Sequence, residues 1–132
     1  MIDIFDELYT YLDTALKSHD SKIETSSVYV NVPSKYPFVS FEEIHNSVYE
    51  RGSDSCDIEN YADVEYEANI YTQNPLKKSK ADEIAKVVDT LMKSKGFTRM
   101  SKNILQDTNE TTYRLILRYS GIVSKEKVIY RR

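Results

Sequence analysis

The sequence predicts an α+β domain in which an antiparallel or mixed sheet of four to six strands carries two main helices on one face. Residues 61–73 alternate apolar and polar side chains with a period of two, which is typical of a strand with one buried face. Residues 76–95 place apolar side chains at helical spacing. Predicted strands flank this helix on both sides, which favours an antiparallel layer in the order α-β-β-α-β-β over a βαβ winding.

The first element expected is a helix over residues 2–17. Ile4, Leu8 and Leu12 recur at the spacing of one helical face. Asp6 lies in the predicted first turn, where a carboxylate complements the helix dipole. These features indicate an amphipathic helix that packs on a core.

Two strands and a long connection are expected next. Residues 18–27 are polar and predict a loop, whereas residues 28–32 are a candidate short strand. Residues 35–44 predict a second strand, and Pro37 near its start indicates an edge position or a strand entrance. Residues 46–60 are small, polar and contain a glycine, so they predict a long hairpin connection of the kind that often carries function.

The strand over residues 61–73 is the best defined element. Pro75 ends it, because proline cannot donate to a ladder and suits the start of a helix. A helix over residues 76–95 follows, and Gly96 supplies its C-terminal stop. Three carboxylates share the polar face of the strand and are expected to be solvent-exposed: Asp63, Glu65 and Glu67.

Strands are also expected after the second helix. Residues 97–105 alternate imperfectly, residues 106–110 predict a turn, and residues 111–120 alternate again. Residues 128–130 either extend this strand or pair separately. The whole chain, 1–132, is expected to form a single domain without repeats.

Composition excludes several classes of protein. Hydrophobic residues make up 40% of the 132 residues and charged residues 30%, so a real core is available. The net charge of −3 argues against a general nucleic-acid binder. Cys56 is the single cysteine, which rules out an intrachain disulfide. The acidic N-terminal residues and the lack of a long apolar run predict a soluble protein made in a cytoplasm, with no membrane partner.

The candidate chemistry is sparse. His19, His45 and Cys56 lack the spacing of a metal site. Asp54 and Asp57 lie in one acidic segment but lack the twelve-residue calcium-loop pattern. The sequence contains no Gly-rich phosphate loop, nucleophile elbow or metalloprotease motif. We therefore expect no catalytic residues, no cofactor and no metal.

Two further features concern surfaces. Eleven tyrosines and no tryptophan suit half-wet sheet faces, and some of these rings could lie in a subunit interface. Lys77 and Lys78 begin a basic cluster at a predicted helix start, where positive charge opposes the helix dipole. The cluster either is solvated or meets an acidic partner surface.

Several phrases along the chain belong together. They are residues 36–43, 46–50, 58–71, 80–85, 88–92, 96–99 and 129–132. These phrases resemble a family of small prophage proteins from the head–tail gene cluster of long-tailed phages of Gram-positive bacteria, and that family is similar to tail terminator, or tail completion, proteins. The resemblance covers nearly the whole chain, and its phrases are structural rather than catalytic.

The resemblance implies a structural virion protein that caps the tail tube as a hexameric ring and offers a head-to-tail joining surface. Its implied partners are further copies of itself, the tail tube protein, possibly a sheath protein, and the connector or neck proteins of the head. Genomic DNA would only pass through the pore. The implied location is the tail–neck region of the virion, assembled in the cytoplasm of the bacterial host.

Interface residues are inferred, since such terminators share no universal motif. Edge strands at residues 28–32 or 128–130 could pair across subunits. If the long connection lines the pore, its carboxylates would repeat by symmetry into acidic rings that let DNA slide. The inferred oligomer or tube contacts are Tyr49, Arg51, Asp54, Asp57, Lys77, Lys78, Arg131 and Arg132. A head-completion or neck adaptor protein is the alternative function, and a small cytoplasmic enzyme or binding module is less favoured.

Overall fold

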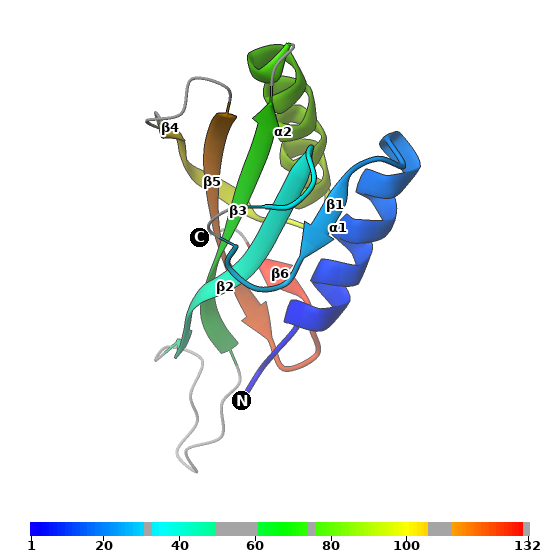
Figure 1. The fold of residues 1–132 in the computed structure, drawn as a ribbon. Coiled ribbons are helices and arrows are strands. Elements are labelled where there is room, and N and C mark those ends of the chain that lie inside the picture. The colour runs from blue at the N-terminus through cyan, green and yellow to red at the C-terminus, as the bar shows by residue number, and fades with distance from the viewer. Residues whose placement is uncertain (31–32, 50–60, 74–75, 106–111, 131–132) are drawn as a thin grey trace, which may run out of the picture.

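A computed structural model describes residues 1–30, 33–49, 61–73, 76–105 and 112–130. Two helices pack on one face of a mixed sheet, so the predicted α+β class is confirmed (Figure 1). The elements in chain order are α1 (Phe5–His19), β1 (Glu24–Ser26), β2 (Phe38–Val48), β3 (Tyr61–Gln73), α2 (Lys77–Ser94), β4 (Thr98–Leu105), β5 (Thr112–Ser124) and β6 (Ile129–Tyr130).

The sheet has the strand order β1-β2-β3-β5-β4, and β6 pairs with β5 beyond Thr98, the first residue of β4. Among the described strands, only β1 runs parallel to its neighbour, and every other pair is antiparallel. β3 and β5 pair without a break, from Tyr61 opposite Ser124 to Gln73 opposite Thr112. This long central ladder makes the middle of the sheet its stiffest part.

Helix α2 is terminated as the sequence predicts. Gly96 has a φ of 99°, a left-handed conformation that glycine adopts without steric cost. The backbone N–H of Phe97 donates to the carbonyl of Met92 at 3.1 Å, and that of Gly96 donates to Lys93 at 3.0 Å. This pair of bonds is the Schellman arrangement, which satisfies the last carbonyls of the helix.

The core lies between the helices and the sheet. Helix α1 buries Leu8, Leu12 and Leu16, one on each successive turn. From β3 the even-numbered side chains enter the core, as their period of two predicts. The ring of Tyr66 stands at the centre, 5.5 Å from the ring of Phe41 and edge-on to a second aromatic ring.

The first predicted strand is misplaced. Residues 28–30 form no strand, and residues 31–32 lie outside the described residues. The strand is instead β1, inside the segment predicted as a loop. Ile23, fully buried, anchors it, and the Thr25 backbone pairs opposite Val39 of β2. Three residues are too few to show a period, so the pattern cannot reveal this strand.

β2 also extends further than expected, to Val48, into the segment predicted as a connection. Pro37 lies just before the strand, and its carbonyl accepts from the backbone N–H of Glu24 at 3.1 Å. The strand-entrance alternative is thus correct. The edge alternative is wrong, because β2 lies between β1 and β3.

The polar face of β3 is not exposed to solvent. Asp63 and Glu67 are each only 9% exposed, and Asn69 is fully buried. β3 has strands on both sides, and long side chains such as Arg118 reach across it from β5. The expectation of solvent-exposed charges is therefore wrong for Asp63 and Glu67.

The C-terminal strands follow the prediction closely. A register shift between Arg99 and Ser101 explains the imperfect alternation of β4. β5 continues past the predicted end at residue 120, with Gly121 inside it. Tyr130 in β6 pairs opposite Ile122, so these residues form a separate strand. No helix among the described residues is long and apolar enough to cross a membrane.

Candidate functional site

The sheet face opposite the helices carries a connected row of polar side chains. Arg114 donates from Nε and Nη2 to Oδ1 of Asn69, at 3.1 and 2.8 Å. Asn69 donates from Nδ2 to Oε1 of Glu67 at 3.1 Å. Nε of Arg118 lies 3.3 Å from Oε2 of the same carboxylate. We call these four residues, together with Glu42, the polar row.

The two carboxylates of the polar row, Glu42 and Glu67, have different surroundings. Glu42 of β2 pairs opposite Glu67 of β3, so two carboxylates face each other across strands. Burial and the neighbouring Glu67 raise the pKa of Glu42, and the positive charge of Arg114 only partly offsets them. Glu42 is therefore the less stabilised carboxylate of the two.

One end of the polar row is covered by aromatic rings. The guanidinium of Arg114 lies 5.3 Å from the ring centroid of Tyr71 and 5.5 Å from that of Tyr29. The hydroxyl of Tyr71 donates to the carbonyl of Val30 at 2.8 Å. Burial raises the pKa of Tyr71 to about 12, although Arg114 acts in the opposite direction. These contacts hold residues 29–30 over this face of the sheet.

The polar row is built to hold charges in place. A general acid or base needs a carboxylate that can exchange its proton with a substrate. Both oxygens of Glu67 are already engaged, and Arg114 is fixed by Asn69 and two rings. Glu67 and Arg114 are therefore held in fixed positions.

A group of tyrosines marks one end of the sheet. The backbone N–H of Tyr49 donates to the carbonyl of Tyr61 at 3.0 Å, where the chain leaves β2 and re-enters β3. The ring of Tyr130 meets that of Tyr61 edge-on, 6.1 Å between centroids. We call Tyr49, Tyr61 and Tyr130 the tyrosine end. These three tyrosines therefore lie at the same end of the sheet.

The three inferred interface residues that the structure describes do not form one site. Tyr49 belongs to the tyrosine end, whereas Lys77 and Lys78 begin α2, beyond the far end of β3. A thirteen-residue strand such as β3 spans about 40 Å. The other predicted contacts lie outside the described residues: Arg51, Asp54, Asp57, Arg131 and Arg132.

The basic start of α2 has a partner within the chain. Nζ of Lys80 lies 2.7 Å from Oδ2 of Asp20, which follows the end of α1. The hydrogen bond from Lys80 lowers the pKa of Asp20. This carboxylate also supplies negative charge near the N-terminus of α2, so part of the unfavourable dipole interaction is relieved inside the molecule.

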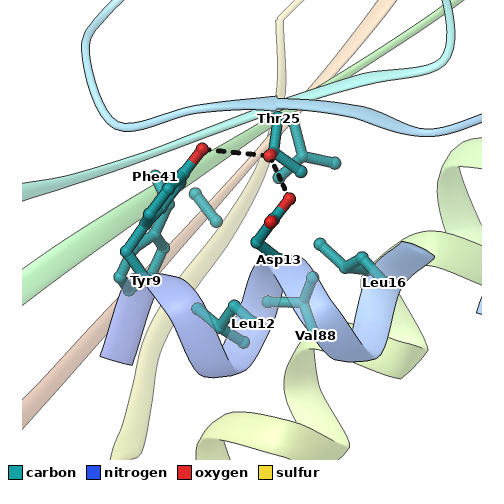
Figure 2. A pocket seen from close by; sticks show the side chains of 9 residues that line it. Tyr9, Leu12, Asp13, Leu16, Thr25, Phe41 and Val88 are labelled. Carbon is teal, nitrogen blue, oxygen red and sulfur yellow. Dashed lines mark hydrogen bonds between the residues drawn. The ribbon is translucent and has the colours of Figure 1, made fainter. Parts of the chain in front are cut away.

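A small internal hollow lies between α1 and the sheet (Figure 2). Its volume is about 10 Å³, room for about one water molecule. Thr25 of β1 donates to Oδ1 of Asp13 at 2.5 Å and lies 3.0 Å from the hydroxyl of Tyr9. The hydrogen bond from Thr25 lowers the pKa of Asp13 against the opposing effect of burial. The hollow is too small for a ligand, and its polar groups fasten β1 to α1.

The two histidines contact different residues. Nε2 of His19 lies 2.9 Å from Oε1 of Glu83, and Nε2 of His45 lies 3.0 Å from the hydroxyl of Ser47. Across the described ranges, no group of three or more potential ligands could hold a metal ion. Cys56 lies outside these ranges.

Sequence reasoning missed the polar row. Two signals pointed to it: Arg114 and Arg118 alternate with apolar residues on β5, and Asn69 continues a run of carboxylates on β3. Their pairing depends on the register of β3 with β5, which local pattern does not supply. Comparison with models of protein families finds no match, and none of the curated proteins matches the chain.

Proposed function

We propose that this chain is a structural virion protein that caps the tail tube of a long-tailed phage as a ring of identical subunits and offers a docking face to the head connector. The observation that carries the proposal is the resemblance of residues 36–43, 58–71 and 88–92 to tail terminator proteins. In this proposal the protein acts by shape and makes or breaks no bonds.

The build of the subunit supports this role. A ring that bears the load of a capsid needs rigid subunits, and the thirteen-residue ladder between β3 and β5 provides a stiff centre. Within the polar row, the half-exposed Arg118 is paired with the buried Glu67, so it places a fixed positive charge on the face that the helices leave uncovered. Pre-organised charges favour specific docking, because little conformational freedom is lost on binding.

The tyrosine end is the proposed contact with the tube or pore. Tyr130 is 48% exposed beside Tyr61, and tyrosine is enriched in protein interfaces. Arg51, Asp54 and Asp57 follow Tyr49 in the chain, and Arg131 follows Tyr130. Their predicted role as tube or pore contacts stays a prediction.

The test is to add gold-labelled protein to isolated tails and examine them by negative-stain electron microscopy. We expect label at the head-proximal end of each tube, and particles lacking the protein should have tubes of irregular length without capsids. A sixfold ring supports the tail cap. A twelvefold ring on the head connector would instead support the neck adaptor, and normal virions without the protein would end both proposals.

A further inference from the structure

A half-open pocket lies where the first turns of α1 meet the turn between β5 and β6 (Figure 1). Its volume is about 170 Å³. Ile4, Leu8 and Ile129 supply its apolar lining, and we call these three side chains the aliphatic floor. A cavity of about 150 Å³ lined by aliphatic and aromatic side chains holds a benzene ring. The pocket is therefore large enough for one aromatic ring or one short alkyl chain.

The rim of the pocket carries more positive than negative charge. Lys127 from the turn and Lys95, which follows α2, supply two ammonium groups, and Glu7 supplies the one carboxylate among the described lining residues. Lys127 pairs with Glu7. Lys95 lies over the ring of Tyr11, 4.2 Å from its centroid, and has no carboxylate partner in the described part of the chain. The rim therefore keeps one positive charge that no carboxylate balances.

The walls of the pocket are held in place by contacts within the chain. The hydroxyl of Tyr11 lies 3.2 Å from Oγ of Ser94, which fixes this ring beside Lys95. Ile129 packs closely on Gly96, where an added Cβ would lie 3.2 Å from the Ile129 carbonyl oxygen. Walls that are already ordered lose little conformational freedom when a ligand binds. The pocket is thus pre-formed, as small-molecule sites usually are.

The backbone of Lys127 has an unfavourable conformation. Its φ of 66° lies in the left-handed region, which glycine or asparagine adopts more readily than lysine. Such conformations persist mainly where the residue serves a function. Here the conformation places the lysine side chain at the pocket, beside Glu7. An ammonium group has three donors, so Lys127 can contact Glu7 and a ligand at the same time.

We propose that this pocket binds a small carboxylate that carries one aromatic ring or one short apolar chain. The apolar part would lie on the aliphatic floor, and the carboxylate would accept hydrogen bonds from the ammonium groups of Lys95 and Lys127. Such a carboxylate belongs either to a small molecule or to the C-terminal residue of a peptide. The binding site does not depend on the proposed role in capping tails.

Phenylacetate and phenylacetamide test the site, because they share one ring and differ in the charge of one end. Each is titrated into isotope-labelled protein, and the backbone amide signals are followed by NMR. Phenylacetate should shift the signals of Leu8, Lys95 and Ile129 with a dissociation constant of about 1 mM, as expected for about ten heavy atoms in a half-open pocket. Phenylacetamide should bind about threefold more weakly or worse, because it lacks the charge. Equal binding of the two compounds, or no shift of these signals at about 10 mM phenylacetate, would overturn the proposal.

Two exposed lysines of similar setting give a matched comparison. Lys95→Gln removes the ammonium group that has no carboxylate partner, so it should weaken phenylacetate binding about threefold and leave phenylacetamide binding unchanged. Lys86→Gln, on α2 outside the pocket, should change neither affinity. Equal losses for both compounds in Lys95→Gln would show that the shape of the pocket had changed, and they would overturn the charge contact.

Lys127→Asn separates binding from stability. Asparagine suits the left-handed conformation, so the variant should melt close to the wild-type temperature although the pair with Glu7 is lost. Its affinity for phenylacetate should nevertheless fall about threefold, because one ammonium group is missing. A folded variant with unchanged affinity would overturn the contact between Lys127 and the ligand.

A tripeptide distinguishes the two sources of the carboxylate. Gly-Gly-Phe with a free C-terminus is compared with the same peptide amidated at that end. If the free peptide shifts the same signals and the amidated peptide does not, a chain terminus fits the site. If phenylacetate alone shifts them, the ligand is a small molecule. Either result supports the site, and the absence of both would overturn it.

Discussion

Asp89 joins three groups from different elements. Its carboxylate accepts from the hydroxyl of Tyr119 at 2.9 Å and lies 2.9 Å from Nζ of Lys93 and 3.1 Å from Nη1 of Arg99. Burial acts to raise the pKa of Asp89, but these three partners outweigh it and leave the pKa below its usual value. The charge of Asp89 thus stabilises the contact between α2, β4 and β5.

Replacing Asp89 by Asn should lower the free energy of unfolding by about 1–2 kcal/mol at pH 7, because charge-assisted hydrogen bonds are replaced by neutral ones. Urea denaturation measures this loss. Asp82→Asn is the control, because Asp82 is more exposed and lies 3.8 Å from Lys102. It should cost less than about 0.5 kcal/mol.

The loss in Asp89→Asn should depend on pH. The folded-state pKa of Asp89 is depressed, so its stabilisation is fully present above the unfolded pKa of about 3.9 and disappears as the pH falls through the folded pKa. The free energies of unfolding of the wild type and the variant should converge once the pH lies below the folded-state pKa of Asp89. A constant difference across this range would show that the charge is not responsible.

For Glu42, the pKa shift predicts a change in the free energy of unfolding of the opposite sign. Its pKa is raised by burial and by Glu67, so the ionised form is disfavoured in the folded protein. Glu42→Gln should raise the free energy of unfolding at pH 7 by about 0.2–1 kcal/mol, since it relieves a like-charge cross-strand pair. The gain should vanish as the pH falls through the raised pKa and below about 4. Urea denaturation at both pH values tests this, and a loss at pH 7 would contradict it.

At the scale of elements, β1 shows how side chains can hold a strand that is too short to be stable alone. Three residues supply few ladder bonds, and Thr25 adds hydrogen bonds to Tyr9 and Asp13 of α1. Because α1 also packs on the sheet through the stacked rings of Phe5 and Phe41, the edge strand is held from the helix side.

Thr25→Val keeps the shape of the side chain and removes its hydroxyl. The variant should lose about 1–2 kcal/mol, because the partly buried Asp13 loses a donor, and amide exchange at residues 24–26 should accelerate. Denaturation and hydrogen exchange measure the two effects. Thr90→Val, which removes an exposed bond to the carbonyl of Lys86, should change stability little. Unchanged exchange at β1 would refute the fastening role.

The close approach of the Phe97 ring to β5 depends on Gly121. A Cβ at this position would lie 2.7 Å from Cδ1 and 3.0 Å from Cε1 of the buried Phe97. Gly121→Ala should therefore cost about 1–3 kcal/mol by overpacking. A double-mutant cycle with Phe97→Leu should recover part of this cost. Additive losses would show that the ring is not the obstacle.

At the scale of the whole molecule, the connection after Tyr49 can be separated from the fold. Its backbone N–H already bonds to Tyr61, so removal of residues 51–57 leaves a four-residue hairpin link. The variant that lacks residues 51–57 should fold with nearly unchanged stability but fail to cap tails. Melting and tail-length measurements test this. Normal capping and head joining would remove the connection from the proposed tube contact.

Much of the fold was predictable because its signals are local. The period of two in β3, the helical spacing of α2 and the stop at Gly96 each follow from neighbouring residues, and the structure bears out all three. The candidate site was far less predictable. Of the inferred contacts, Tyr49 lies at the tyrosine end and Lys77 and Lys78 lie at the far end of the sheet.

The sequence by itself determined both helices, the long strands β3 and β5 and the faces of α1, α2 and β3 that enter the core, because side-chain periodicity is a property of neighbouring residues. Only the tertiary structure decided the strand order, the edges and the burial of Glu67 and Asn69. These depend on the partners that distant segments bring to each strand. A polar side chain that reads as solvent-facing on one strand becomes buried when Arg114 and Arg118 reach across from the next.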